Sequence, residues 1–342
     1  MSTYDRLASL PLTLSGYRLE RREMEVSSGF TRVTTTVVLE GNGVEGRGED
    51  VTYDAVDHDG GPIGLDLARA QTLDEFSLRL GDLDLFPSAE PQREPSRDYR
   101  RWAFESAALD LSLRQAGSSL GRAIGRPYRP VRFVVSTRLD IRPWLAIDPE
   151  LEFKLDPTSE WDRSTMQAIA DTRRVRALDF KAYYSGTPVD QAPDPALYRT
   201  CIALFPDAVI EDAALGPEIL PALDGALDRL SFDAPIHSLA DVDALPVEPR
   251  YLNVKPSRFG SLRRLLECID ACDERGIAMY GGGQFELGVG RGQIQALASL
   301  FYPDAPNDVA PGGYNAPEAV AGLPRSPLAP PAAPVGFAWE SA

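Results

Sequence analysis

The chain has 342 residues, a length that allows one large domain or two of ordinary size. Its 51 acidic and 35 basic residues give a formal net charge of -16, which repels nucleic acid and anionic membranes. No apolar run reaches the roughly 20 residues that cross a bilayer, and the N-terminus lacks a signal-peptide pattern. We therefore expect a cytoplasmic protein with no nucleic-acid or membrane partner.

The first third of the chain predicts an α+β domain. Residues 10–55 read as antiparallel strands, because a segment rich in Val and Thr is broken by glycines. Residues 64–80 and 98–117 are predicted helices, the second from apolar side chains at helical spacing. We expect residues 1–125 to form a cap domain.

After about residue 130, short β-branched or apolar runs alternate with amphipathic helices. The predicted strands are VRFVV (131–135), LEFKL (151–155), RALDFK (176–181), AVIE (208–211), RLSFD (229–233), YLNVK (251–255) and IAMY (277–280). Alternation of this kind indicates a parallel sheet, and seven repeats in fewer than 200 residues favour a closed barrel. The fold class is therefore α/β, a modified TIM barrel over residues 126–322, with a Pro- and Ala-rich tail (323–342) packing on the cap.

Charged residues stand at the carboxyl ends of these strands, where a parallel barrel places its chemistry. They are Lys154, Asp156, Asp179, Lys181, Glu211, Asp233 and Lys255. So many charges do not suit a dry core, because each unpaired buried charge costs several kcal/mol. A ring of ion pairs that only closes the barrel is the alternative interpretation.

Several segments, in the right order, resemble the enolase superfamily and its muconate-lactonizing subgroup, the o-succinylbenzoate synthases and N-succinylamino acid racemases. They are GVEGRGED (43–50), FESAALDLSLRQAGSSLGRAIG (104–125), DAVIEDAAL (207–215), LSFDAPIHSLADVDAL (230–245), LNVKPSRFGSL (252–262) and YGGGQFELGVGRGQIQALASLFYPDAPNDVAP (280–311). The resemblance implies a cap domain on a (β/α)7β barrel. It also implies abstraction of a proton next to a carboxylate, with Mg2+ on three carboxylates and lysines as acid and base.

Carried over residue by residue, the resemblance assigns Glu211 and Asp233 to the metal and Lys255 to the lysine of the sixth strand. In ALDFKAYY, however, it puts Lys181 where the metal-binding aspartate of the family should stand. The second strand has Lys154 followed by Asp156, where the family has two lysines. Lys181 could replace the metal, or Asp156 or Asp179 could supply the third ligand. The expected catalytic residues are Lys255, Lys154, Lys181 and Asp156.

Four further residues are expected to contact the substrate. Arg32 stands in a cap loop (27–32) that could equally be an exposed hairpin, and His237 follows the fifth strand, where a helix cap explains it as well. Gln284 and Glu286 belong to the glycine-rich loop after the seventh strand.

Three functions remain open from the sequence. The first is a lyase or isomerase acting on a small carboxylate metabolite, with the enediolate stabilised by Mg2+ or by Lys181. The second is a metal-free Schiff-base lyase or aldolase that uses a barrel lysine. The third is a non-catalytic protein that binds a metabolite, and a homo-oligomer is compatible with all three.

Overall fold

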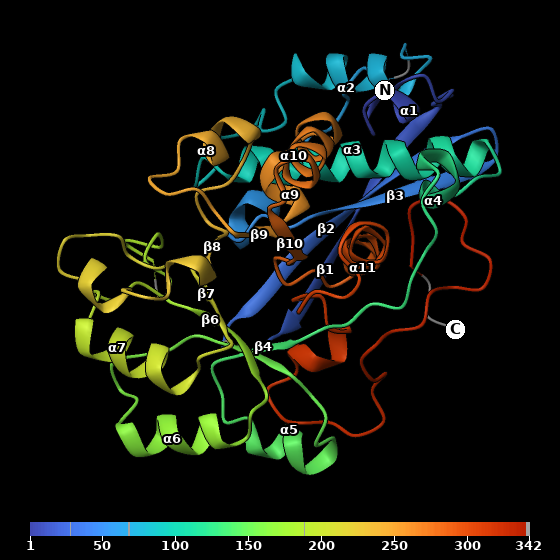
Figure 1. Ribbon diagram of the computed structural model, residues 1–342. Coiled ribbons are helices and arrows are strands. Elements are labelled where there is room, and N and C mark those ends of the chain that lie inside the picture. Colours follow the sequence, from blue (N-terminus) through green and yellow to red (C-terminus); the bar gives the residue numbers. More distant parts are fainter. Residues whose placement is uncertain (28, 68, 188, 340–342) are drawn as a thin grey trace.

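The computed structural model describes residues 1–27, 29–67, 69–187 and 189–339. An antiparallel sheet with helices forms one part of the molecule and a curled parallel sheet with its helices forms the other (Figure 1). The predicted cap loop and the C-terminal tail each extend partly outside the described residues. Within the described ranges, no helix is long and apolar enough to cross a membrane.

The antiparallel sheet has the strand order β1-β2-β3, with β1 over Gly16–Glu25, β2 over Thr31–Gly41 and β3 over Val44–Asp50. Asn42 and Gly43 both have positive φ, 51° and 74°, as a two-residue turn that matches the strand twist requires. This sheet confirms the antiparallel strands predicted over residues 10–55.

The long helix α3 (Ser96–Gln115) lies against β3 at very short range, which two glycines allow. A Cβ atom on Gly46 would lie 2.3 Å from the Leu111 nitrogen, and one on Gly48 would lie 2.0 Å from the Ala103 oxygen. The other helices of the first 125 residues are α1 (Asp5–Ala8), η1 (Ala55–His58), α2 (Leu73–Gly81) and α4 (Leu120–Ile124). The helix predicted over 64–80 begins only at Leu73, after Thr72, whose side chain caps it.

The parallel sheet has seven strands in the order β10-β9-β8-β7-β6-β5-β4. Their bounds are β4 Val135–Thr137, β5 Phe153–Leu155, β6 Val175–Asp179, β7 Val209–Glu211, β8 Leu230–Phe232, β9 Tyr251–Val254 and β10 Ala278–Gly281. Each predicted strand overlaps an observed strand in chain order, so the predicted barrel is confirmed, although the first, predicted over 131–135, begins only at Val135.

A short segment closes this barrel between its first and last strands. The Val134 amide donates to the Asn307 carbonyl at 2.8 Å, and the Asp308 amide donates to the Gly281 carbonyl at 2.8 Å. Asn307 and Asp308 therefore take the place of an eighth strand.

Helices cover the barrel unevenly. They are α5 (Arg142–Ile147), α6 (Arg163–Asp171), α7 (Pro195–Leu204), α8 (Leu239–Asp243), α9 (Pro256–Phe259), α10 (Leu262–Arg275) and α11 (Val289–Phe301), with the 3-10 turns η2 (Leu220–Ala222), η3 (Leu227–Arg229) and η4 (Gly312–Asn315). As predicted, α7 begins at Asp194-Pro195 and α10 ends at Gly276 in the left-handed conformation. Only 3-10 turns connect β7 to β8.

The C-terminal tail touches both parts of the molecule (Figure 1). Leu328 exchanges backbone hydrogen bonds with Val131 at the start of the barrel. Farther along, the Phe337 ring packs edge-on against Trp102 of α3 with centroids 6.3 Å apart, and its amide donates to Asp110 at 2.7 Å.

Candidate active site

Three buried carboxylates meet at the carboxyl ends of neighbouring strands. Asp179 ends β6, Glu211 ends β7 beside it in register, and Asp233 directly follows β8. One oxygen of each lies within 4.8 Å of the others, and all three side chains are buried. This group is called the carboxylate cluster below.

The cluster corrects the assignment of Lys181 to the position of a metal-binding aspartate. Asp179 is the residue that stands beside Glu211, whereas the chain has left the sheet at Lys181, where φ is 55°. The Lys181 ammonium turns back to form an ion pair with Asp179 and lies 3.8 Å from Asp156. Lys181 is therefore a neighbour of the cluster, and Asp179 is its third carboxylate.

Lys154 of β5 is the lysine that reaches into the cluster. Its ammonium forms an ion pair with Glu211 and lies 3.1 Å from Asp179 and 3.6 Å from Asp308. Burial disfavours this charge, but the three carboxylates outweigh burial and raise the pKa of Lys154 well above its ordinary value. Lys154 is thus held as an ammonium.

Lys255 follows β9 and binds the third carboxylate. Its Nζ lies 2.8 Å from Asp233, and the Arg258 guanidinium lies 3.1 Å from the other oxygen of the same group. Tyr184 also donates a hydrogen bond to Asp233 at 3.0 Å. Burial opposes ionisation of the Asp233 carboxyl, but Arg258 and Lys255 outweigh it and hold its pKa below the usual range.

The other two carboxylates differ in proton affinity. Burial, together with the charges of Asp179, Asp233 and Asp212, raises the pKa of Glu211 to about 8 in spite of Lys154. Burial also disfavours the Asp179 carboxylate, but Lys181 and Lys154 outweigh it and lower the pKa of Asp179. Glu211 also accepts hydrogen bonds from Asn253 and Tyr280.

A cavity of about 390 Å³ lies directly above these groups, between the barrel mouth and the cap. Lys154, Lys181, Lys255 and Asp156 line it from the barrel side, while Phe30, Tyr53 and Arg93 line it from the cap. Asp156 also binds Arg138 at 2.7 Å. The structure therefore brings all four expected catalytic residues to one cavity.

The chain contains only three lysines, Lys154, Lys181 and Lys255, among its 35 basic residues. All three line this cavity. The remaining basic residues counted here are all arginines. Arginine stays charged at any ordinary pH, whereas the amine of lysine can exchange a proton. All side-chain amines of the chain therefore face one cavity.

Three of the four expected substrate contacts do not reach this cavity. Arg32 is fully buried and donates to the carbonyls of Thr52, Val51 and Gln284, so it ties the cap to the barrel. The His237 ring contacts the Arg258 carbonyl at 3.0 Å. Glu286 is buried, and its carboxylate accepts a hydrogen bond from the backbone N–H of Gln284.

Gln284 alone of the four lines the cavity. Its side-chain amide accepts a hydrogen bond from the Tyr53 hydroxyl and donates one to the Tyr99 hydroxyl. Arg32 lies on β2, whereas His237 comes after β8 and Glu286 after β10. The direction of the side chain depended on neighbours from distant parts of the chain.

Sequence reasoning missed several residues that complete the site, namely Arg138, Tyr184, Asn253, Arg258, Tyr280 and Asp308. Two of them had a usable signal. Asn253 lies two residues before Lys255 and so shares its face of β9. Arg258 stands three residues after Lys255, within the short helix α9, which directs it back toward Asp233.

The carboxylate cluster has the donor set that Mg2+ prefers, namely hard oxygen ligands. Asp233 Oδ1 is buried and accepts no hydrogen bond from the described residues, although its ion pair with Arg258 spans 3.1 Å. The neighbouring Asn253 Oδ1 is also buried and accepts no hydrogen bond from these residues. The donor set of the cluster therefore fits a divalent cation, which would share the carboxylates with the ammonium groups that contact them in this structure.

Comparison with known proteins places this site in a family. Residues 127–316 match the family described as "Domain of unknown function (DUF8230) C-terminal domain", and residues 5–123 match the corresponding N-terminal domain. The chain belongs to the DUF8230 family.

Two relatives with named activities share about a quarter of their residues with this DUF8230 protein. It is 25% identical to o-succinylbenzoate synthase from Geobacillus stearothermophilus over 338 residues, covering 86% of this chain and 84% of the relative. It is also 25% identical to N-succinylamino acid racemase from Thermus thermophilus over 337 residues, covering 89% and 84%. Muconate lactonizing enzyme from Pseudomonas fluorescens, solved with muconolactone, has the same fold, with a TM-score of 0.64 at 17% identity over 87% of this chain and 88% of that one. The expected resemblance to the enolase superfamily and its muconate-lactonizing subgroup is thereby confirmed.

Proposed function

We propose that this protein abstracts a proton next to the carboxylate of a small organic acid, as a lyase or isomerase. The observation that carries the proposal is the convergence of all three lysines of the chain on one cavity beside three buried carboxylates. The relatives named o-succinylbenzoate synthase and N-succinylamino acid racemase support the same class of reaction.

The barrel cavity is lined by an amine, Lys255, and by a carboxylate, Asp156. Lys255 follows the sixth strand of the barrel and Asp156 follows the second, so they approach a bound molecule from opposite walls. Both Lys181 and Lys255 carry positive charge toward the cavity, and this charge attracts a substrate carboxylate.

In the proposed step, the C–H bond next to the substrate carboxylate breaks. Its proton passes to the Asp156 carboxylate and its electron pair forms an enediolate. The Lys255 ammonium stabilises this anion and can return a proton to the product. Asp179, Glu211 and Asp233 would hold a Mg2+ ion, whose positive charge would stabilise the enediolate further.

The Schiff-base alternative is less well supported by the state of the lysines. A nucleophilic lysine must lose its proton, which requires a lowered pKa. Carboxylates contact each of the three amines, and the pKa of each is raised. Treatment with borohydride and a panel of small keto acids should therefore leave the mass of the protein unchanged.

The proposal is tested without knowledge of the product. The protein is incubated in D2O with a panel of small carboxylates and Mg2+, and loss of the α-proton signal is followed by NMR. We expect exchange with at least one acid, abolished by Lys255→Ala. Absence of exchange across the panel, with Mg2+-loaded protein of native fold, would favour a non-catalytic binding protein.

A further inference from the structure

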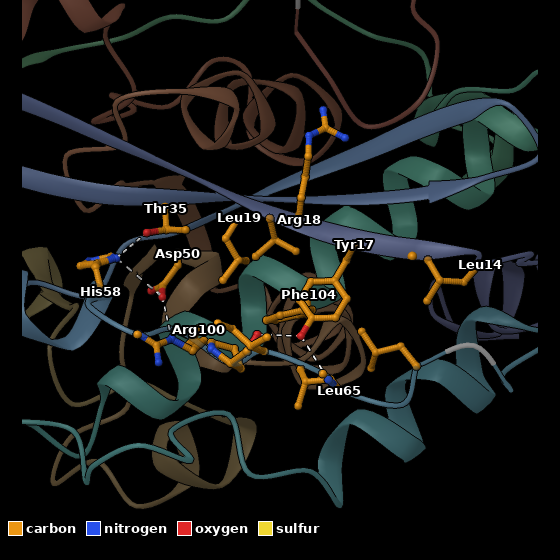
Figure 2. A pocket seen from close by; sticks show the side chains of 18 of the residues that line it. Leu14, Tyr17, Arg18, Leu19, Thr35, Asp50, His58, Leu65, Arg100 and Phe104 are labelled. Carbon is orange, nitrogen blue, oxygen red and sulfur yellow. Dashed lines mark hydrogen bonds and ion pairs between the residues drawn. The ribbon is translucent and has the colours of Figure 1, made fainter.

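A second cavity is larger than the one above the barrel. It has a volume of about 730 Å³ and lies in the cap, between the face of β1, helix α3 and the loop 60–67 (Figure 2). The groups discussed above for catalysis line a separate cavity. The cap cavity therefore needs an explanation of its own.

The wall of the cap cavity is mainly apolar. Tyr17 and Leu19 extend from β1 toward Leu65 and Phe104, while Arg18 points to the opposite side of the strand (Figure 2). The loop also presents Ile63, whose side chain is 83% exposed at the same cavity. Exposed apolar surface around a concave apolar wall is characteristic of a ligand site.

The polar groups at one end of the cavity already satisfy one another. Arg100 donates to Asp50 at 2.8 Å and to the Leu85 carbonyl at 3.0 Å. His58 contacts Thr35 at 2.8 Å through one ring nitrogen and the Thr52 carbonyl at 2.9 Å through the other. This end can close the cavity without a polar ligand group.

Arg21 is the cation available to a ligand at the rim. It lies two residues beyond Leu19 and therefore points to the same side of β1 as Tyr17 and Leu19. Its partners are Glu23 at 2.9 Å and Asp59 at 2.6 Å, whose side chains are 54% and 69% exposed. Exposed pairs of this kind are weak, so an anionic ligand group can compete for Arg21.

The wall of the cavity includes a long stretch of β1 and the residues before it. Its wall follows the chain from Leu14 to Arg21, a length of about 23 Å at the rise of a strand. An apolar wall of this length can accommodate one extended alkyl chain.

We propose that the cap cavity is a second binding site, for a single-chain amphiphile whose alkyl chain lies along β1 and whose anionic head group binds Arg21. The site is separate from the barrel cavity and does not depend on the reaction proposed for it.

The test is calorimetric titration of the full chain with dodecanoate below its micelle concentration. We expect saturable binding of one molecule per chain. Dodecyltrimethylammonium is the matched probe with the opposite charge, and we expect it to bind at least roughly 10-fold more weakly. Because the protein carries a net charge of -16, nonspecific attraction would produce the reverse order.

Single substitutions in the cavity wall and at Arg21 test where dodecanoate binds. Leu19→Trp fills the cavity and Leu65→Asp places a charge in its apolar wall, and each should abolish dodecanoate binding while circular dichroism shows a native fold. Arg21→Gln should weaken binding by roughly 3- to 10-fold. Arg22→Gln makes the same charge change on the opposite face of β1 and should have no effect. Unchanged binding in both apolar-wall variants, or equal losses in the two arginine variants, would overturn the proposal.

Discussion

The Lys255 ammonium lies 2.8 Å from the carboxylate of Asp233, so the lysine of the sixth barrel strand is bound directly to the carboxylate cluster. Burial alone would lower the pKa of Lys255, but Asp233 outweighs it and raises that pKa. Lys255 is therefore charged in this arrangement, which suits stabilisation of an anion and donation of a proton.

Replacement of Lys255 tests this role directly. We expect Lys255→Ala to slow α-proton exchange by roughly 100-fold or more. The loss in free energy of unfolding should stay below about 3 kcal/mol, because Arg258 and Tyr184 still contact Asp233. Lys255→Arg is the matched control, since it keeps the charge without a transferable proton. Full activity of Lys255→Arg would reduce the role of Lys255 to electrostatics.

Divalent-cation binding by the carboxylate cluster can be measured without a substrate. We expect Mg2+ to raise the melting temperature of the wild-type protein, by an amount equivalent to about 2.7 kcal/mol at 100 times its Kd. Asp179→Asn should remove most of this shift, while Asp156→Asn, which changes a cavity carboxylate outside the cluster, should retain it. Equal shifts in all three proteins would place the ion elsewhere.

The three lysines can be observed individually by NMR after 13C labelling of lysine, because the chain has no others. Burial opposes each charge, but neighbouring carboxylates raise each pKa above the ordinary value of 10.5. We expect no titration of the three side-chain signals up to about pH 10. A lysine that titrates near neutrality would instead identify a base or nucleophile and revive the Schiff-base alternative.

Glu105 of α3 should make stability depend on pH. Burial raises the pKa of its carboxyl above the ordinary value of 4.5, against the opposing charge of Arg101. The folded protein then binds this proton more tightly than the unfolded chain does. The contribution of Glu105 to stability is therefore greatest below pH 4.5 and is lost as the pH rises through its folded pKa.

Urea unfolding at a series of pH values measures this effect. Glu105→Gln removes the titration, so its free energy of unfolding should decline less above pH 4.5 than that of the wild type. Glu267→Gln changes an exposed carboxylate of α10 and should keep the wild-type slope. Identical slopes in all three proteins would show that Glu105 does not titrate in this range.

The C-terminal tail should contribute strongly to stability through Phe337. Its ring is fully buried against Trp102, so Phe337→Ala should cost about 3–5 kcal/mol in thermal or chemical unfolding. Val335→Ala, two residues earlier and 47% exposed, should change stability by no more than about 0.5 kcal/mol. A small effect of Phe337→Ala would mean that the tail only covers the surface.

The local sequence was sufficient to predict the order of the barrel strands and the ends of some helices. Alternating apolar runs indicated the seven barrel strands, Asp194-Pro195 and Gly276 marked helix ends, and charged residues stood out at the strand ends. These signals are local because the side-chain period of a strand and the cap of a helix involve only neighbouring residues.

Tertiary structure alone decided which side chains meet. Asp179 and Lys181 are two residues apart and equally plausible as the third member of the cluster, until the chain leaves the sheet between them. Lys154 reaches Glu211 across 57 positions of sequence, and Arg32 is buried by carbonyls of the barrel loop. Such contacts depend on how distant strands and loops are placed in space, because the net energy of a buried charge depends on all of its neighbours.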